Sequence, residues 1–257
     1  MSKIYILGKD SRSLRLKEMY KKEEKTVDKI ESAEIVVCPM PLSRNGSTVD
    51  TEDITCDQLI QMCKGKKVFS GAISKEMKSK FEGEKIDYVD MLDLEEVAIL
   101  NSIPTAEGAI SIAMEMTDFT LHDSNCLVMG YGRIGKVLAK MLSGVGANVY
   151  CEARSEKDLA SINVMKYMSV RLNELKNCLP KMDIIFNTVP NLLLKEEEIQ
   201  LLRKSSVIID LASKPGGVDQ NAASKAGINT VWALGLPGKV APYTAAKYLK
   251  NTIDKSI

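Results

Sequence analysis

Short apolar runs alternate with segments whose apolar residues recur at helical spacing throughout this chain of 257 residues. Apolar runs of about four to eight residues indicate buried strands, and a period of about 3.6 indicates amphipathic helices. Strands that alternate with helices predict an α/β fold with parallel sheets. The predicted strands are residues 4–7, 34–38, 67–70, 86–89, 126–129 and 148–151, a weaker one near Val164, and residues 183–189, 206–211 and 229–234.

One glycine-rich segment, GYGRIG at residues 130–135, lies between an apolar run and a segment whose apolar residues recur at helical spacing. Gly130 permits a tight turn, Gly132 lets a pyrophosphate approach the backbone, and Gly135 lets the helix pack against the sheet. The helix directs its positive end at the diphosphate. This context predicts a dinucleotide site that also includes Arg133 and Ile134. The alternative is a strand-to-helix turn that binds no ligand.

The strand after this helix indicates which dinucleotide is bound. A site for the unphosphorylated cofactor usually places Asp or Glu at the end of that strand, to accept from the ribose 2′-OH. Here the end falls near Ala153, and Arg154 and Ser155 follow it. An arginine fork pairs well with a phosphate, so the pattern favours NADP, with NAD possible. Glu152 is the alternative ribose ligand, but strand alternation points it away from the direction of Ala153.

The glycine motif begins only at residue 130, so the preceding segment is predicted to form an α/β layer of its own. Pro104 suits the first position of a helix, and residues 104–119 are predicted to connect two domains. Residues 242–253 form a last helix that crosses back. The sequence therefore predicts a smaller N-terminal flavodoxin-like α/β domain, residues 1–102 with 242–257. It also predicts a C-terminal Rossmann-type domain with a doubly wound parallel sheet, residues 103–241.

Ligands of such sheets bind beyond the carboxyl ends of the strands. The cofactor candidates there are Thr188, Val189 and Pro190 after one strand, Asp210 at the end of the next, and Leu236 and Pro237 after the last. Ser213 and Lys214 in this domain, with Arg12 and Arg44 in the first, are candidates to contact an anionic substrate. Each of these segments has an alternative as an ordinary tight loop or surface cation.

Composition excludes several classes of function. Lys and Arg number 35 against 34 Asp and Glu, so no strong field attracts nucleic acid. No apolar run is expected to reach the length of a membrane span, and residues 4–7 resemble a first strand more than a signal peptide. The six cysteines form no CxxC pair and there is one histidine, which argues against a structural zinc. Free, buried thiols would suit a reducing cytoplasm.

The single histidine bears on mechanism. A hydroxy-acid dehydrogenase needs a base beside the nicotinamide, usually histidine. His122 lies just before the first strand of the nucleotide domain, at the amino end of the sheet. A 2-hydroxy-acid or amino-acid dehydrogenase of the same plan is therefore a weaker hypothesis. A cofactor-binding regulatory protein without independent activity is a third.

Several longer segments carry a family resemblance. They are residues 101–108 (NSIPTAEG), 117–122, 130–135, 146–149 with 153–155, 210–219 and 235–245, and residues 8–12 match more loosely. With these segments the chain resembles the family of dipicolinate synthase A-subunits, although its first hundred residues look shorter and more divergent than is usual there. The resemblance covers the chain best from Asn101 onward.

This resemblance implies oxidation of 2,3-dihydrodipicolinate to dipicolinate with NADP, in the cytoplasm of a sporulating mother cell. It implies a flavoprotein-like partner, the dipicolinate synthase B-subunit, and a homo-oligomer is expected. Asn101, Thr105 and Glu107 would shape the pocket, with Glu107 as a candidate proton acceptor. Neither nucleic acid nor membrane is expected as a partner.

Overall fold

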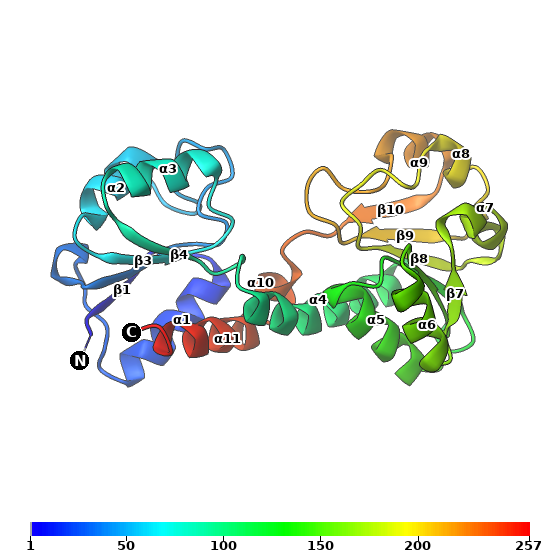
Figure 1. Cartoon of the computed structure of the whole chain (residues 1–257), viewed down its shortest axis with the longest axis horizontal. Coiled ribbons are helices and arrows are strands. Elements are labelled where there is room, and N and C mark those ends of the chain that lie inside the picture. Colours follow the sequence, from blue (N-terminus) through cyan, green and yellow to red (C-terminus); the bar gives the residue numbers. More distant parts are fainter. Residues whose placement is uncertain (1) are drawn as a thin grey trace. The chain divides into compact units, whose positions relative to one another are not determined.

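The computed structural model describes residues 2–257 and divides the chain into two compact units. Unit 1 contains the chain up to Asn101 together with Pro237–Ile257, and unit 2 is Ser102–Leu236. Each unit is a parallel β-sheet covered by helices on both faces (Figure 1). The predicted α/β fold with two parallel sheets is confirmed.

The sheet of unit 1 has four parallel strands in the order β1-β2-β3-β4. Their bounds are β1 Ile4–Ile6, β2 Ile35–Val37, β3 Lys67–Ser70 and β4 Asp87–Asp90. Thr26 forms an isolated parallel bridge to Ile4 on the free side of β1. When this bridge is counted as a second strand, the order becomes that of flavodoxin-like sheets.

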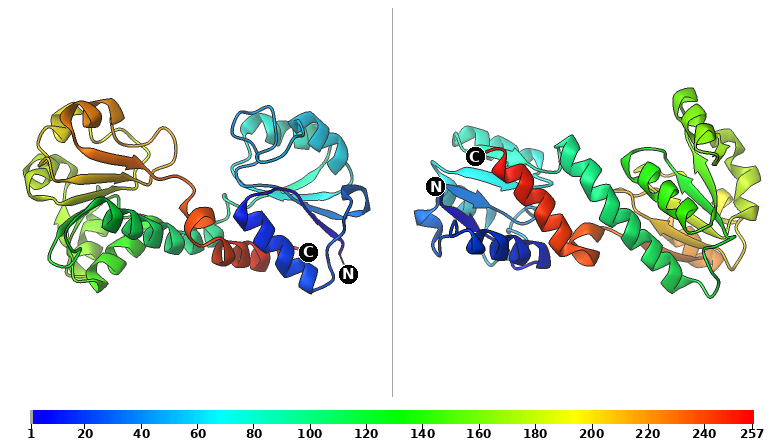
Figure 2. Two further views of the ribbon diagram at one scale, coloured as in Figure 1. Left: turned by 180° about the vertical axis from the view of Figure 1, so that it is seen from behind. Right: turned by 90° about the horizontal axis from the view of Figure 1, so that it is seen from below.

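Helices cover both faces of the unit 1 sheet. The helices of this unit are α1 Ser11–Lys22, α2 Cys56–Cys63, α3 Lys75–Gly83 and α11 Pro242–Asp254, with the short η1 Ile30–Ser32. Alternate strand residues point to opposite faces. One face therefore packs against α2 and α3, and the other against α1 and α11. Figure 2 shows α1 and α11 side by side, and the Tyr20 hydroxyl of α1 donates to Asp254 of α11 at 3.0 Å.

The sheet of unit 2 has six parallel strands in the order β10-β9-β8-β5-β6-β7. Their bounds are β5 Asn125–Met129, β6 Asn148–Glu152, β7 Met168–Val170, β8 Ile184–Asn187, β9 Val207–Asp210 and β10 Asn229–Trp232. Numbered within the domain from β7, this is the Rossmann order 3-2-1-4-5-6, with the switch point between β5 and β8. A ligand is expected in the crevice beyond the carboxyl ends of these two strands.

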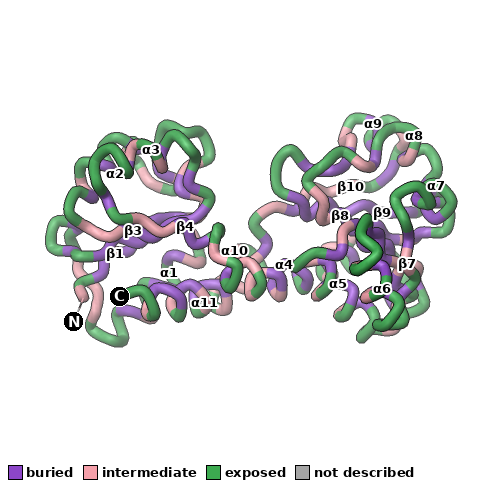
Figure 3. The backbone as a smooth tube through the Cα atoms, viewed as in Figure 1, coloured by how far each residue is buried: buried purple, intermediate pink, exposed green. Residues whose placement is uncertain are grey.

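Two hydrophobic cores lie on the faces of this second sheet. The helices are α4 Glu95–Met116, which begins in unit 1, α5 Arg133–Gly144, α6 Glu156–Val164, α7 Leu175–Cys178 with the short η2 Leu172–Glu174 and η3 Leu179–Lys181, α8 Glu196–Ile199 and α9 Gln220–Ala226. The short α10 Leu236–Val240 starts at the last residue of unit 2 and continues in unit 1. Residues of α4, α5 and α6 form the core on one face, and residues of α7, α8 and α9 form it on the other. Figure 3 shows the strands buried between layers whose outer surfaces are exposed.

Two predicted elements are placed differently. The helix expected to start at Pro104 begins at Glu95, contains Pro104 in its interior and ends at Met116. Proline removes one backbone hydrogen bond, but burial of Val97 and Ser102 before it favours the longer helix. The strand expected near Val164 is also wrong, because Val164 is the exposed last residue of α6 and β7 follows it.

The sequence-based expectation that no segment reaches the length of a membrane span is wrong for α4. This helix of 22 residues is long and apolar enough, by length and composition, to cross a bilayer. Its Ala106, Ala109 and Ala113 are instead fully buried in the core of unit 2. Core helices often share this composition, so nothing further about membranes follows from it.

Candidate cofactor site

The glycine loop after β5 is tightly packed at two positions. Gly130 has φ +88°, and a Cβ there would lie 2.7 Å from Thr188 Oγ1 and from Val189 Cγ2. A Cβ on Gly135 would lie 2.0 Å from the Gly130 carbonyl oxygen. Side chains at these positions would force the strand, the turn and α5 apart. The motif is therefore a tightly packed turn in which α5 contacts the end of β5 directly.

The third glycine of the loop leaves space. A Cβ on Gly132 would meet nothing within 4 Å, and Gly132 is the exposed N-cap of α5. Within residues 2–257, no side chain caps this helix start. First-turn N–H groups without a side-chain cap, at the positive end of a helix, form an anion site. The residues present therefore fit the diphosphate of a dinucleotide, next to Arg133 and Ile134 of the first turn.

The loop after β8 lies directly against this turn. The Thr188 backbone N–H and hydroxyl both donate to the Met129 carbonyl, at 3.0 and 2.9 Å. Val189 is half-buried beside Gly130, and Pro190 is exposed. The structure thus brings these three predicted cofactor residues to the switch point of the sheet.

Asp210 has a different role from the predicted one. Its carboxylate is 1% exposed and accepts from Asn187 Nδ2 at 2.8 Å, Ala212 N at 3.0 Å and Gly217 N at 2.9 Å. These protein hydrogen bonds organise the loop after β9, so the carboxylate does not face a cofactor. The residues after β8 were expected from the sequence to flank the nicotinamide ribose, and Asn187, the last residue of that strand, is instead buried against Asp210.

Leu236 and Pro237 follow β10 at the start of α10. Leu236 is buried in the core of unit 2, which limits it to apolar contact. Pro237 is half-buried, and the division between the units falls between these two residues.

A surface pocket of about 490 Å³ lies beyond the carboxyl ends of β6 and β7. Its lining residues are Ala153, Arg154, Arg171, Leu172 and Asn173. Arg154, predicted to meet a 2′-phosphate, is exposed here. Ser155 instead caps α6, because its hydroxyl accepts from Asp158 N at 3.1 Å and donates to Asp158 Oδ2 at 2.7 Å. Sequence reasoning missed Arg171 because it misplaced β7, the strand that Arg171 follows.

Glu152 points away from this pocket. It is 1% exposed, and its Oε2 accepts from the Gly130 backbone N–H at 3.2 Å. The other oxygen, Oε1, has no hydrogen-bond partner within the described chain. Burial raises the pKa of Glu152 above its ordinary value, against the smaller lowering effects of the Gly130 N–H and Arg154. The geometry therefore agrees with the expectation from strand alternation.

The four residues proposed to contact substrate belong to different units. In unit 1, Arg12 is half-buried and donates to the Met40 carbonyl at 2.5 Å, and burial lowers its pKa. Arg44 is exposed and pairs with Asp50 at 3.0 Å. Ser213 and Lys214 are exposed in the loop after β9 of unit 2. Neither unit alone brings all four together.

The three candidate catalytic residues all lie on α4. Residues four apart share one face of a helix, so Asn101 and Thr105 point in similar directions. Glu107 is two residues further along and points to another side, where it is exposed. The structure therefore groups Asn101 with Thr105 and separates Glu107 from them.

His122 lies at the amino edge of the sheet. It precedes β5, its side chain is 69% exposed, and Nδ1 lies 3.1 Å from Asp123 Oδ2. The cofactor loops are at the opposite, carboxyl edge. The histidine of this chain is therefore remote from the glycine loop within unit 2.

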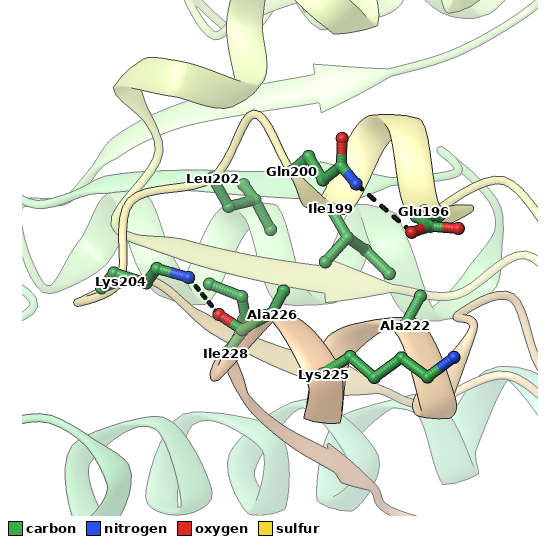
Figure 4. Close-up of a pocket in the computed structure, with 9 residues that line it drawn as sticks. All are labelled: Glu196, Ile199, Gln200, Leu202, Lys204, Ala222, Lys225, Ala226 and Ile228. Carbon is green, nitrogen blue, oxygen red and sulfur yellow. Dashed lines mark hydrogen bonds between the residues drawn. The ribbon is translucent and has the colours of Figure 1, made fainter.

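A second pocket, of about 240 Å³, lies between α8 and α9 (Figure 4). Figure 4 shows Ile199 and Leu202 in its wall, with Lys204 bonded to the Ala226 carbonyl and Gln200 bonded to Glu196. Lys204 precedes β9 and Ile228 precedes β10, so the pocket extends toward the amino ends of those strands. It is separate from the glycine loop.

Comparisons with known proteins agree with this geometry. Residues 104–227 match the NAD-binding domain of D-isomer-specific 2-hydroxyacid dehydrogenases. The chain is 39% identical over 188 residues, 73% of its length, to the dipicolinate synthase A-subunit of Bacillus subtilis. This alignment spans 63% of that relative, which is less than two thirds. The crystal structure of the same Bacillus subtilis protein has 30% identity and a TM-score of 0.87, covering 99% of this chain and 95% of that one.

The chain belongs to the family of dipicolinate synthase A-subunits. A second member of known structure, from Bacillus halodurans, has 28% identity and a TM-score of 0.90, covering 99% of this chain and 97% of that one. A transhydrogenase from Sinorhizobium meliloti, at 18% identity and a TM-score of 0.73, shares the fold over 93% of this chain and 80% of its own. The family and its nucleotide domain make this chain a dehydrogenase-type oxidoreductase with a nicotinamide cofactor.

Proposed function

We propose that this chain oxidises 2,3-dihydrodipicolinate to dipicolinate, pyridine-2,6-dicarboxylate, with NADP as the hydride acceptor. The observation that carries the proposal is the structural match over nearly the full length of dipicolinate synthase A-subunits. With this activity the protein would work in the mother-cell cytoplasm of a sporulating bacterium.

The reaction suits a site without a histidine base. The dihydro ring loses a hydride to the nicotinamide and a proton to solvent or a nearby weak base, and an aromatic pyridine results. Aromaticity favours the product, so a strong general base is not required. A 2-hydroxy-acid or amino-acid dehydrogenase would need such a base, and His122 lies at the amino edge of the sheet.

The choice of NADP rests on the end of β6. Ala153 occupies the place where a ribose-binding carboxylate is usual, and Arg154 follows in the pocket. Glu152, the nearby acid that a register change would bring to the ribose, bonds instead to Gly130. A guanidinium at this position, with the acid directed elsewhere, favours the 2′-phosphate.

The two substrate carboxylates require cations or N–H groups. Arg12, Arg44 and Lys214 are the proposed partners, and Ser213 supplies a hydroxyl in the same loop as Lys214. Arg44 would exchange its ion pair with Asp50 for a substrate carboxylate.

The chain is further proposed to form a homo-oligomer and to work with the flavoprotein-like dipicolinate synthase B-subunit. The decisive experiment mixes 2,3-dihydrodipicolinate with NADP and with enzyme in excess over the NADP, and measures NADPH formation in a single turnover, first with this chain alone and then with the B-subunit added. Reduction by the chain alone supports an independent enzyme. Reduction only in the presence of the partner supports a dependent catalytic chain. No reduction in either mixture refutes the proposal and favours a regulatory cofactor-binding role.

Cofactor choice is tested separately by thermal unfolding. A ligand that binds only the folded state stabilises it by RT ln(1 + [L]/Kd) and so raises the melting temperature. NADP should therefore raise the melting temperature more than NAD at equal concentration. Equal shifts would contradict the assignment of the 2′-phosphate.

A further inference from the structure

We infer that Arg171 is a second phosphate-binding cation, which exchanges Glu156 for the 2′-phosphate and sets the preference for NADP together with Arg154. This inference rests on the proposed use of NADP and extends it to a residue on a different strand. Parallel strands β6 and β7 pair with Glu152 opposite Val170, and Ala153 N donates to the Val170 carbonyl at 3.2 Å. The residues that follow each strand, including Arg154 and Arg171, therefore leave the sheet side by side.

Both arginines line the same pocket. Its other lining residues are Ala153, Leu172 and Asn173, which bring apolar surface and an amide but no negative charge. An adenosine extending from the glycine loop meets the end of β6 first and the end of β7 next, because β5, β6 and β7 are successive neighbours. A phosphate on its ribose can then reach guanidinium groups from both strand ends.

The backbone of Arg171 is fixed by its neighbours. Its N–H donates to Glu174 Oε2 at 3.0 Å, at the start of η2 Leu172–Glu174. The Cα position is thus determined by the strand on one side and the short helix on the other. The Arg171 side chain is 46% exposed and its guanidinium can reorient without disturbing the core.

The Arg171 guanidinium already binds a carboxylate, that of Glu156. Both Nη atoms donate to the two carboxylate oxygens of Glu156, with Nη2 to Oε2 at 2.7 Å. This is the fork geometry with which arginine also binds a phosphate. Glu156 is in the first turn of α6 and its side chain is 76% exposed, so water and a dianion can reach the pair and replace the carboxylate. Once displaced, the Glu156 carboxylate becomes a like charge beside the phosphate.

Calorimetric titration of the full chain with adenosine 2′,5′-bisphosphate and with adenosine 5′-monophosphate tests the inference without requiring catalysis. Arg171→Ala should weaken the bisphosphate about tenfold or more, which is about 1.4 kcal/mol, and leave the monophosphate nearly unchanged. Arg171→Lys, which keeps the charge without the fork, should lose part of the affinity. Glu156→Gln should tighten the bisphosphate by removing the competing charge.

Arg203→Ala is the matched control. Arg203 is also an arginine of unit 2, is 47% exposed and pairs with a carboxylate, Asp183, at 2.6 Å, but it lies at the amino edge of the sheet. Loss of the Arg203 guanidinium should change the affinity for neither the bisphosphate nor the monophosphate. Melting temperatures of all variants show whether each remains folded.

The outcomes separate this inference from the proposed function. If the unmodified chain binds both nucleotides equally, the proposed use of NADP is wrong, and the inference fails with it. If the unmodified chain prefers the bisphosphate and Arg171→Ala keeps that preference, only the role of Arg171 is refuted. Weaker bisphosphate binding by Glu156→Gln would refute the exchange and show that Glu156 orients the arginine.

Discussion

The Asn187 side-chain amide donates to Asp210 Oδ1 at 2.8 Å and joins the carboxyl ends of the adjacent strands β8 and β9. Both side chains are buried, and their oxygens also accept from loop backbone N–H groups. The two loops beside the glycine turn are therefore held by one buried polar pair. Buried polar networks stabilise a fold when all their groups are bonded and destabilise it when one is left unpaired.

Asp210→Ala should destabilise unit 2. The substitution leaves Asn187 Nδ2 without one acceptor and two backbone N–H groups unsatisfied, at a cost of about 3 kcal/mol. Urea unfolding monitored by Trp232 fluorescence measures the change, because Trp232 donates to the Ala212 carbonyl in the same loop. The exposed Asp118→Ala serves as control and should stay within about 0.5 kcal/mol. Equal effects of the two substitutions would contradict the assigned role.

Gly135→Ala should remove cofactor binding and lower stability by about 3 kcal/mol, because the new methyl group meets the Gly130 carbonyl at 2.0 Å. Gly144→Ala in the same helix is the control, since a Cβ there meets nothing within 4 Å. Its stability should be unchanged or raised by up to about 1 kcal/mol. Titration with NADP measures cofactor binding by both variants, and thermal unfolding measures their stability. A Gly135→Ala chain that still binds NADP normally would disprove the close contact.

Glu152 should make unfolding depend on pH. Its pKa is raised in the folded state by burial, so the folded state binds its proton more strongly than the unfolded state. The stability contribution of the protonated form is present below the unfolded pKa and is lost as pH rises through the folded pKa. Glu152→Gln removes this dependence. The variant should therefore gain stability relative to the parent as pH rises from the unfolded pKa of Glu152, and urea midpoints across that range measure it. A constant difference would show that the pKa of Glu152 is not perturbed.

Glu107→Gln should keep most of the turnover. Glu107 is exposed on a different side of α4 from Asn101 and Thr105, which share a face. A general base contributes about 10²–10⁴ to the rate, so a loss below about tenfold would exclude that role. Thr105→Val should lower turnover more. Steady-state turnover of both variants with 2,3-dihydrodipicolinate tests this prediction. A loss of turnover of about a hundredfold or more in Glu107→Gln alone would identify Glu107 as the proton acceptor.

Much of unit 2 could be predicted because its central strands are buried on both faces. Residues 206–211 and 183–189 are largely apolar runs, and β9 and β8 lie within them. The edge strand β7 is different: it has three residues, and two of them, Met168 and Ser169, are not buried. A strand that is buried on only one side has few apolar residues in its sequence. The predicted strand was therefore placed near the β-branched Val164 instead.

The candidate site was predictable to the extent that its residues lie on such strands. The glycine loop and Arg154 follow β5 and β6, whose runs are clear, whereas Arg171 follows β7 and was missed. The role of Asp210 could not be predicted, because a strand-end carboxylate can face a ligand or its own loop. Only the positions of Ala212 and Gly217, set by the folded loop, decide between the two.

The packing of α11 into unit 1 has a consequence for how the chain folds during translation. Ala246, Leu249 and Ile253 fill the same core as Ile4, Leu16 and Phe69, so that core stays open until the ribosome has delivered both. Residues 102–236 are contiguous and have emerged by then. The Rossmann unit can therefore fold first on the nascent polypeptide, while β1 and α1 wait for α11.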